Sequence, residues 1–366
     1  MLSRSSHVTE QQLPSTIAEL DRHVIGGVDT HKDFHVAVVI NMIGHVLDTA
    51  RFITNPDGYA GLLTWMTGHG SVAKIGVEGT GAYGAGLARH LTAAGVDVIE
   101  INRPDRQMRR RRGKSDPTDA EAAARAVLSG EASLTPKDSS STTEAVRALR
   151  VVRRSAMHNR TQAANQIHNL VLTAPAALRV ELADSSVARL ATVIMALDEP
   201  DQIVCVRTGT ITALQHLARR WQALTIEIKQ LDKTLTELIA RIAPPNLLAM
   251  QGVGTDVAGA LLVAIGSNPE RVHTEAGLAA LCGASPVETS SGRRQGSHRL
   301  NRGGNREANN ALWRIVMVRM SHDPRTRDYV QRRTQQGKSK KAIMRCLKRY
   351  IVREVFNSMQ RTTSLT

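Results

Sequence analysis

Four carboxylates stand at polar breaks in an otherwise apolar N-terminal region. Asp29 lies in GGVDTHKD, Glu78 follows the apolar part of IGVEGTG, and Asp116 and Asp119 lie three residues apart in KSDPTDAEAAARAV. A carboxylate at the end of a buried strand is costly unless it is paired, hydrogen-bonded or bound to a metal. Four such groups clustered in space would repel one another and hold Mg²⁺, with Mn²⁺ as an alternative. Two such cations can polarise a phosphodiester, activate the attacking oxygen and stabilise the leaving one.

Ordinary structural roles remain open for these carboxylates. Glu78 could pair with Lys74, and Asp116 could cap a helix that begins at Pro117. Asp119 would then lie in the first helical turn, where a negative charge is favourable. Capping and metal ligation are compatible, so the pattern alone does not choose between them.

The segment around Asp29 offers two further polar side chains. Asp29 could simply begin a turn. Asp33 is another candidate ligand, since residues 29 and 33 share one face of an extended strand. His31 would point the other way on that strand and is expected to be structural.

A serine pair before a glycine, Ser290 and Ser291, is the second candidate centre. A hydroxyl is a poor nucleophile until one group removes its proton and another stabilises charge on the phosphorus under attack. Arginines can meet the second need, although a flexible turn is the ordinary interpretation of Ser-Ser-Gly. The cationic and imidazole side chains of this stretch are Arg293, Arg294, His298, Arg299, Arg302 and Arg306.

Two further motifs suit a polyanionic ligand. The run RPDRQMRRRRGK directly precedes the Asp116 pair and could hold phosphates beside it, although such runs are often only solvated. Gly252 and Gly254 of GVG lie between helical segments as in a helix-hairpin-helix, whose backbone N–H groups can contact phosphate without reading sequence. A corner used only for packing would look the same. The cations of the run are Arg103, Arg106, Arg109, Arg110, Arg111, Arg112 and Lys114.

The elements that must position the carboxylates form an α/β region over residues 23–135. An apolar, β-branched run from residue 23 reads as one long strand or two short ones, followed by a hairpin partner. Strands then alternate with helices. This order predicts a mixed sheet flanked by helices, the layout of the RNase H and RuvC-like nucleases.

The rest of the chain is expected to be all-α. Residues 141–244 contain two long amphipathic helices, over 142–172 and 209–242, joined by a shorter helical excursion. They could form a packed bundle or a coiled-coil arm for dimerisation. We expect a small helical domain over 245–335 and a basic helix and tail over 336–366, with residues 1–22 as a flexible tail.

Composition narrows the class of protein. A formal net charge of +15 favours a nucleic-acid partner. Three widely spaced cysteines without a CxxC motif argue against a disulfide framework or a zinc cluster. The chain has neither a signal-peptide pattern nor an apolar run long enough to span a membrane, so we expect a cytoplasmic protein, associated with the nucleoid during activity.

The motifs GVDTHKD, VEGTGAY, KSDPTDA, GVG, GASPVETSSG and HRLNRGGNREANNAL occur in that order. In this the chain resembles the DEDD transposases of bacterial insertion sequences, the family numbered 110 and known for bridge-RNA guidance. The resemblance covers nearly all of residues 23–335. One departure is the stretch from Arg299 to Arg302, where many relatives carry a shorter Ile-Ser-Lys type of sequence, so the phosphate contacts of these arginines are not carried over.

The resemblance implies that Asp29, Glu78, Asp116 and Asp119 are the metal-binding tetrad of a RuvC-like domain. It also implies that Ser291 attacks DNA to form a 5′-phosphoserine intermediate, with Ser290 as the one-residue alternative. Its implied partners are donor and target DNA, a structured noncoding bridge RNA and further copies of the chain, as a dimer to a tetramer.

Two other functions fit part of the pattern. A RuvC-like junction nuclease would use the acidic site and water, and would not need the serine. A basic architectural or RNA-binding protein would use the carboxylates only as caps and ion-pair partners. Loss of a carboxylate in that protein would affect stability and no reaction.

Overall fold

The computed structural model describes residues 22–101, 115–138, 141–182, 186–288, 298–301 and 303–360. They fall into two compact units, within Met1–Ser140 with Gly266–His273 and within Ser141–Ile265 with Thr274–Thr366. The predicted tail up to residue 21, the basic run 103–114 and the serine pair lie outside the described residues. So do Arg293, Arg294 and Arg302.

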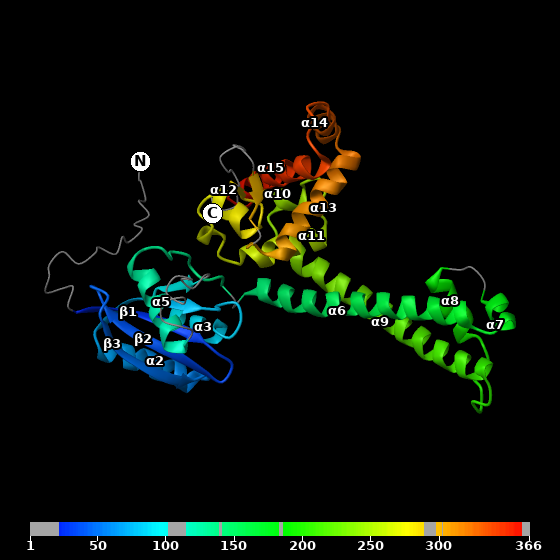
Figure 1. The fold of residues 1–366 in the computed structure, drawn as a ribbon, viewed down its shortest axis with the longest axis horizontal. Helices are drawn as coiled ribbons and strands as arrows, with labels where there is room; N and C mark the ends of the chain where they lie inside the picture. The colour runs from blue at the N-terminus through cyan, green and yellow to red at the C-terminus, as the bar shows by residue number, and fades with distance from the viewer. Residues whose placement is uncertain are drawn as a thin grey trace. The chain divides into compact units, whose positions relative to one another are not determined.

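A five-stranded mixed sheet forms the centre of the first unit (Figure 1). Its order is β3-β2-β1-β4-β5, with antiparallel pairing from β1 to β3 and parallel pairing of β1 with β4 and of β4 with β5. The predicted mixed sheet is thereby confirmed, and its order is consistent with a RuvC-like fold. The strands are β1 (His23–Thr30), β2 (Phe34–Asn41), β3 (Val46–Ile53), β4 (Ser71–Glu78) and β5 (Val98–Ile101).

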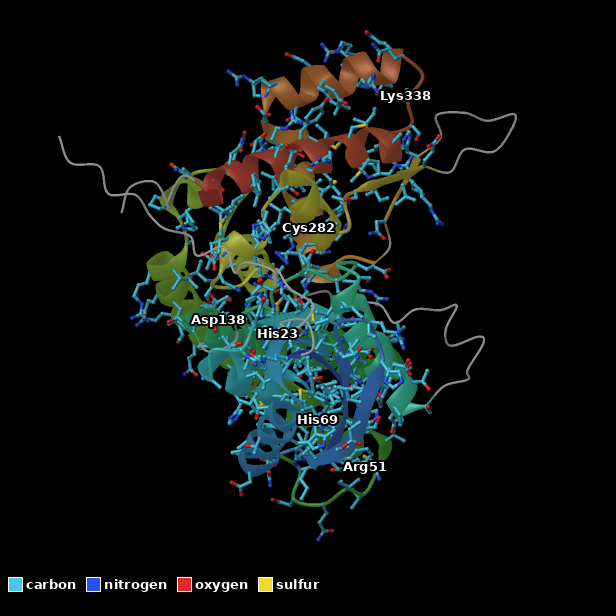
Figure 2. All side chains as sticks on the ribbon, turned by 90° about the vertical axis from the view of Figure 1, so that its left-hand side faces the viewer. His23, Arg51, His69, Asp138, Cys282 and Lys338 are labelled. Atoms are coloured by element: carbon cyan, nitrogen blue, oxygen red, sulfur yellow. The ribbon has the colours of Figure 1, made fainter. Side chains whose placement is uncertain are left out.

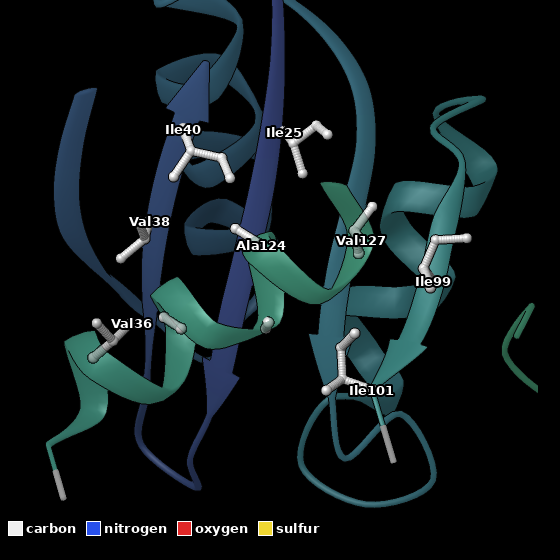
Figure 3. Close-up of a cluster of buried hydrophobic side chains, with 10 residues drawn as sticks. Ile25, Val36, Val38, Ile40, Ile99, Ile101, Ala124 and Val127 are labelled. Carbon is white, nitrogen blue, oxygen red and sulfur yellow. The ribbon is translucent and has the colours of Figure 1, made fainter. Parts of the chain in front are cut away.

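Helices cover both faces of this sheet. Helices α2 (Pro56–Gly68) and α3 (Ala85–Ala93) pack on one face, where Leu62 and Leu87 are fully buried. On the other face α5 (Asp116–Leu128) lies across the strands, as Figure 3 shows. Apolar side chains therefore alternate between two cores along each central strand, as expected for a sheet buried on both sides.

Two long helices form an antiparallel pair in the second unit, α6 (Thr142–Thr173) and α9 (Val206–Ile242) (Figure 1). The short helices α7 (Ala176–Glu181) and α8 (Val187–Met195) connect them, as predicted. At this connected end the two long helices share one core with α7 and α8. Part of their apolar surface is thus buried within the chain itself. A coiled-coil role remains a proposal.

The rest of the second unit consists of helices and an exposed two-stranded hairpin. The GVG sequence lies at the corner between α10 and α11, and the basic C-terminal helix predicted near residue 339 is α15. None of the described helices is long and apolar enough to cross a membrane. These elements are α10 (Pro245–Leu248), α11 (Thr255–Ile265), α12 (Glu275–Leu281), β6 (Pro286–Glu288), β7 (His298–Leu300), α13 (Arg306–His322), α14 (Pro324–Gln335) and α15 (Lys340–Gln360).

The segment Gly266–His273 leaves α11 and packs with the first unit. It contains the short 3-10 helix η1 (Pro269–Arg271). The buried Arg271 places Nη1 3.2 Å from Glu100 Oε2 on β5 and donates to the Thr135 carbonyl at 3.0 Å. A charged pair thus ties a piece of the second half of the sequence to the edge of the mixed sheet.

Candidate metal centre and nucleic-acid interface

Close packing of α5 on the sheet positions the acidic site. A Cβ atom on Gly27 would lie 2.1 Å from the Ala120 carbonyl oxygen, so only glycine allows the helix backbone to come this near. The small side chains of Ala120 and Ala124 complete the contact. Asp29 lies two residues beyond Gly27 on the same strand and hence on the face that α5 covers.

Parallel pairing brings Glu78 beside Asp29. The register of β1 and β4 runs to Val28 opposite Val77, so the next residues on the two strands are Asp29 and Glu78. The Thr30 hydroxyl donates to the Glu78 carbonyl at 2.9 Å and ties the two strand ends together. The Lys74 ammonium lies 3.3 Å from Asp97, so the alternative pairing of Glu78 with Lys74 is not what the structure contains.

The other two carboxylates come from the first turn of α5. Ser115 is the N-cap residue, and Asp116 is the first residue of the helix, so the predicted N-cap at Asp116 was wrong by one position. The reason is that Ser115 is extended, with φ −143° and ψ 150°, while Asp116 already lies in the helix. Asp116 and Asp119 are therefore i and i+3 neighbours and share one helix face. Asp119 is buried and Asp116 is partly exposed.

The charges of the four groups act on one another. Burial raises the pKa of the Asp29 carboxyl to about 6; His31 opposes this shift, and Glu78, Asp119 and Asp116 add to it. Like charges raise the pKa of a carboxyl only when they are near. The structure thus brings the four predicted carboxylates together, from two strands and one helix.

His31 occupies the middle of this cluster, which corrects the prediction that it points away. Its Nε2 lies 3.4 Å from Asp29 Oδ2 and 3.2 Å from Asp116 Oδ2. Residues two apart on a strand point to the same side, so alternation itself places residue 31 on the side of Asp29, and the expectation that His31 points away misapplied this rule. Asp33 does not join the cluster, because β1 ends at Thr30 and Asp33 lies exposed in the turn that follows.

Neighbouring elements hold the turn that carries His31. The His31 backbone N–H donates to Nδ1 of the buried His35 at 3.3 Å, and the Thr54 hydroxyl donates to the His31 carbonyl at 3.2 Å. Burial lowers the pKa of His35, and its ring stacks on Tyr59 of α2 at 5.7 Å between centroids. A neutral His35 can accept the hydrogen bond and so helps to fix the turn.

The chemistry of the donor set fits a divalent cation. Ligand atoms of Asp29, His31 and Asp116 lie within 4.8 Å of one another. Carboxylate oxygens are the ligands of Mg²⁺ and Mn²⁺, and imidazole nitrogen is more typical of transition metals. A bound cation would also offset the repulsion that raises the Asp29 pKa. The site is therefore a candidate metal centre, to which sequence reasoning supplied the carboxylates and not the histidine.

The two glycines of the GVG corner differ in their surroundings. Gly252 has a positive φ of +86°, and a Cβ there would lie 3.2 Å from the Ile315 Cα, so the turn and its packing on α13 account for it. Gly254 is exposed, and a Cβ there would meet nothing within 4 Å. Of the two glycines, Gly254 is therefore the one whose surroundings leave room for a phosphate.

Two of the predicted cations lie in the described part of the second unit. Arg299 is exposed on β7, and Arg306 is the first residue of α13. Arg306 borders a cleft of about 520 Å³ between α6, α11 and α13. The predictions had omitted four arginines of that cleft, although RALRVVRR in the sequence could have signalled three of them. They are Arg150, Arg153, Arg154 and Arg314.

Carboxylates balance much of the charge in this cleft. Asp256 pairs with both Arg150 and Arg314, and Glu307 pairs with Arg154. Arg150 also donates to the Asp256 carbonyl at 2.7 Å, and burial lowers its pKa against the opposing effect of Asp256. The main role of these ion pairs is therefore to hold α6 against α11 and α13.

Two family models match the chain. Residues 26–174 match the IS110-type DEDD model, described as "Transposase", and residues 245–331 match the model described as "Transposase IS116/IS110/IS902 family". The first match includes all four carboxylates of the candidate metal centre. The second includes the GVG corner, the hairpin β6/β7 and the serine pair.

Two curated proteins are similar over part of their length. An insertion element IS110 uncharacterized 43.6 kDa protein from Streptomyces coelicolor is 32% identical over 179 residues, which are 45% of this chain and 44% of the relative. An insertion element IS900 uncharacterized 42 kDa protein from Mycobacterium paratuberculosis is 28% identical over 149 residues, 40% and 37% of the two chains. The matched part thus spans less than half of each relative.

Proposed function

The chain belongs to the IS110 family of DEDD transposases, and from this premise we propose that it cuts and rejoins DNA to move an insertion sequence. The observation that carries the proposal is the meeting of carboxylates from β1, β4 and α5 at one end of the mixed sheet. Rigid elements hold these groups, as a site for phosphodiester chemistry requires.

Asp29, Glu78, Asp116 and Asp119 are the proposed ligands of Mg²⁺, with Mn²⁺ as an alternative. When bound, the cation would supply Lewis-acid polarisation of the phosphodiester. The chain's own contribution is positional. Two residues at adjacent strand ends and two on one helix face set the direction of the carboxylates, and the turn at His31 closes the site.

Ser291 is the proposed nucleophile. Its Oγ attacks phosphorus, so an Oγ–P bond forms while the P–O3′ bond breaks and the 3′ oxygen leaves as a hydroxyl with the serine proton. A 3′ hydroxyl of the exchanged strand then attacks the phosphoserine, which restores the phosphodiester and returns the proton to serine. Because one ester replaces another, no ATP is consumed. The exposed strands β6 and β7 flank residues 289–297 in the sequence, which contain Ser291.

The proposed partners follow from charge and from the family. Donor and target DNA and a noncoding bridge RNA would meet a chain with a net charge of +15. The run Arg109–Arg112 lies just before the two acidic residues of α5 in sequence and is proposed to hold phosphates near them. We propose a dimer that becomes a tetramer with RNA and DNA bound, in the cytoplasm and at the nucleoid during activity.

A covalent trap tests this function. The full-length protein is incubated with Mg²⁺ and a nicked DNA substrate, and the products are analysed by denaturing gel and peptide mass mapping. We expect a protein–DNA adduct on the peptide that contains Ser291. It should be lost in Ser291→Ala, in Asp29→Ala and in EDTA, because serine and carboxylates act in one step.

Ser290→Ala is the matched control and should still form the adduct. An adduct that survives Ser291→Ala but not Ser290→Ala would move the nucleophile by one residue. Cleaved ends without any adduct would instead support the nuclease that uses water. No reaction in any variant, with DNA binding intact, would support the architectural protein.

A further inference from the structure

A second cavity, of about 410 Å³, opens in the second unit beside the hairpin β6/β7. Part of its wall comes from α15 and from the link between α14 and α15, where Figure 2 labels Lys338. The volume lies within the range of about 300–1,000 Å³ that is usual for ligand pockets. Every residue of the wall lies in the described part of the chain and none belongs to the candidate metal centre.

The wall of the cavity contains apolar side chains and one aromatic ring. Ala284, Leu300 and Ile343 contribute apolar surface, and Ile343 is fully buried beneath it. Tyr350 is 50% exposed and packs edge-on against Tyr329, with ring centroids 5.8 Å apart. The second tyrosine thus helps to hold the first in place beside the cavity.

All the charged side chains of the wall are basic. Arg349 pairs with Glu275, and Arg333 donates to Gln336 Oε1 at 2.8 Å. Within the ranges that the structure describes, no ion pair joins Arg299, Lys338 or Arg345 to a carboxylate, and all three are exposed. Positive potential in a concave site attracts anions more strongly than the same charge on a flat surface.

This charge pattern distinguishes the cavity from the cleft between α6, α11 and α13. In that cleft, Asp256 and Glu307 compensate the arginines. At the hairpin the described residues of the wall include no acidic side chain. Apolar side chains alone in the wall would suit a hydrophobic ligand, and cationic side chains alone would suit free phosphate. The combination fits a ligand with a flat apolar face and flanking negative charges.

We propose that this cavity binds one unpaired DNA nucleotide, with its base against the apolar wall and Tyr350 and its flanking phosphates at Arg299, Lys338 and Arg345. Every base can stack on an aromatic ring, and the phosphates on either side need cations. The inference rests on the proposed function in one respect. DNA rather than RNA is the expected strand because β6 and β7 flank the sequence that contains Ser291.

Photocrosslinking locates the nucleotide directly. The probe is a fluorescein-labelled 12-nucleotide single-stranded DNA with 5-iododeoxyuridine at one position at a time, bound to full-length Ser291→Ala protein in EDTA. We expect a crosslink on the peptide that contains Tyr350, strongest at one probe position, and its loss in Tyr350→Leu. A crosslink map that omits this peptide at every position would overturn the proposal.

Salt titration separates the two kinds of contact. The double variant Lys338→Ala/Arg345→Ala should lose two phosphate contacts. The negative slope of the logarithm of the binding constant against the logarithm of the salt concentration should therefore become shallower by about 1.4, at about 0.7 per contact for single strands. Tyr350→Leu should weaken binding about tenfold, within the range for loss of one stacked base, and leave the slope unchanged. Arg327→Ala, on the exposed surface of α14 outside the cavity, is the control.

Equal slopes for the double variant and wild type would refute the phosphate contacts. Tighter binding and the Tyr350 crosslink for RNA of the same sequence, but not for DNA, would make RNA the occupant and overturn the proposal as stated. Lys338 and Arg345 are exposed, so thermal unfolding of the double variant should match wild type. Tyr350→Leu keeps an apolar side chain against Tyr329, and its thermal unfolding is measured beside wild type to show that the variant is folded. Because no chemistry takes place here, the covalent trap can succeed when this test fails, and the reverse.

Discussion

At the scale of the residue, Asp29 has properties that no single pattern in the sequence displays. The residue is 8% exposed, and burial together with three neighbouring carboxylates raises the pKa of its carboxyl to about 6 against the opposing effect of His31. A carboxyl of this kind is partly protonated near neutral pH without a cation and must lose its proton to bind one. Stability and cation affinity are therefore linked through the same group.

The first prediction concerns the pH dependence of stability in EDTA. A folded-state pKa raised above the unfolded value of 3.8 stabilises the protein below that value, and this stability is lost as pH rises through about 6. This difference in pKa between the folded and unfolded states corresponds to about 3 kcal/mol of unfolding free energy. Asp29→Asn should therefore be more stable than wild type at pH 7.5, by up to this amount, and equally stable near pH 4.

The measurement is urea unfolding from pH 4 to pH 8. Added Mg²⁺ or Mn²⁺ should stabilise wild type at pH 7.5 and not Asp29→Asn, which lacks the anionic ligand. Parallel stability profiles of the two proteins across this range would show that the pKa of Asp29 is not raised in the folded protein.

The second prediction concerns a buried lysine behind the hairpin. Lys348 is 8% exposed, burial lowers its pKa, and its Nζ donates to Asn309 Oδ1 at 2.7 Å and to the Asn309 carbonyl at 3.2 Å. The Asn309 amide donates in turn to the carbonyls of Cys282 and Gly283 at 2.9 and 3.0 Å. The network therefore holds the backbone that leads into β6.

Asn309→Ala removes an acceptor from a buried ammonium and should cost about 3 kcal/mol in unfolding free energy, the upper part of the range for a buried donor left without its partner. Lys348→Met keeps most of the apolar stem without the charge and should cost less. The double variant should then be more stable than Asn309→Ala alone. Urea unfolding of all three supplies the double-mutant cycle, and simple additivity of the two single changes would contradict a coupled pair.

At the scale of the element, the contact of α5 with the sheet decides whether the carboxylates meet. Three features combine there: a glycine on the central strand, small residues on the helix, and acidic residues in its first turn. A second glycine, Gly76 on β4, also lies under α5, where a Cβ would be 2.8 Å from the Ala123 carbonyl oxygen. The site therefore depends on backbone spacing as much as on its ligands.

The third prediction tests this spacing. Gly27→Ala would place a Cβ 2.1 Å from the Ala120 carbonyl oxygen and 2.4 Å from the Ala124 nitrogen, so α5 must shift. We expect a loss of several kcal/mol in stability, as for severe overpacking of a core, and a weaker Mn²⁺-induced increase in melting temperature. Gly81→Ala is the control, because its Cβ would meet nothing within 4 Å. Equal melting behaviour of the two variants would argue against the mechanism.

At the scale of the whole molecule, the second unit leaves a group of large apolar side chains in water. Ile203, Val204 and Val206 are 68%, 75% and 73% exposed at the start of α9. Leu172 and Val180, on α6 and α7 at the same connected end, are 69% and 76% exposed. Exposed apolar groups that cluster in this way often mark protein interfaces.

The fourth prediction assigns this end of the α6/α9 pair to self-association. Ile203→Asp combined with Val206→Asp should lower the mass measured by light scattering, from a dimer or larger assembly towards the monomer, without loss of helix by circular dichroism. Ile43→Asp is the control: this residue of the first unit is 85% exposed and should not matter. An assembly that is unaffected by the double substitution would place the interface elsewhere.

The sequence by itself determined the local features of this protein. Continuous apolar runs rich in β-branched residues specified strands buried on both faces. Amphipathic spacing specified the two long helices, and the polar breaks at Asp29, Glu78 and Asp116 identified the acidic residues. Such patterns reflect the environment of each residue within a few positions of the chain. For that reason the elements, and the four carboxylates as a group, were predictable.

Only the tertiary structure decided how distant parts combine. It placed His31 between two carboxylates that come from different elements, β1 and α5, and it attached Arg271 to Glu100 on the first unit. It also enclosed a basic cavity between the hairpin and α15, whose wall residues range from Ala284 to Tyr350 in sequence. Contacts of this kind depend on strand ends, backbone spacing and burial in three dimensions, and no periodicity along the chain encodes them.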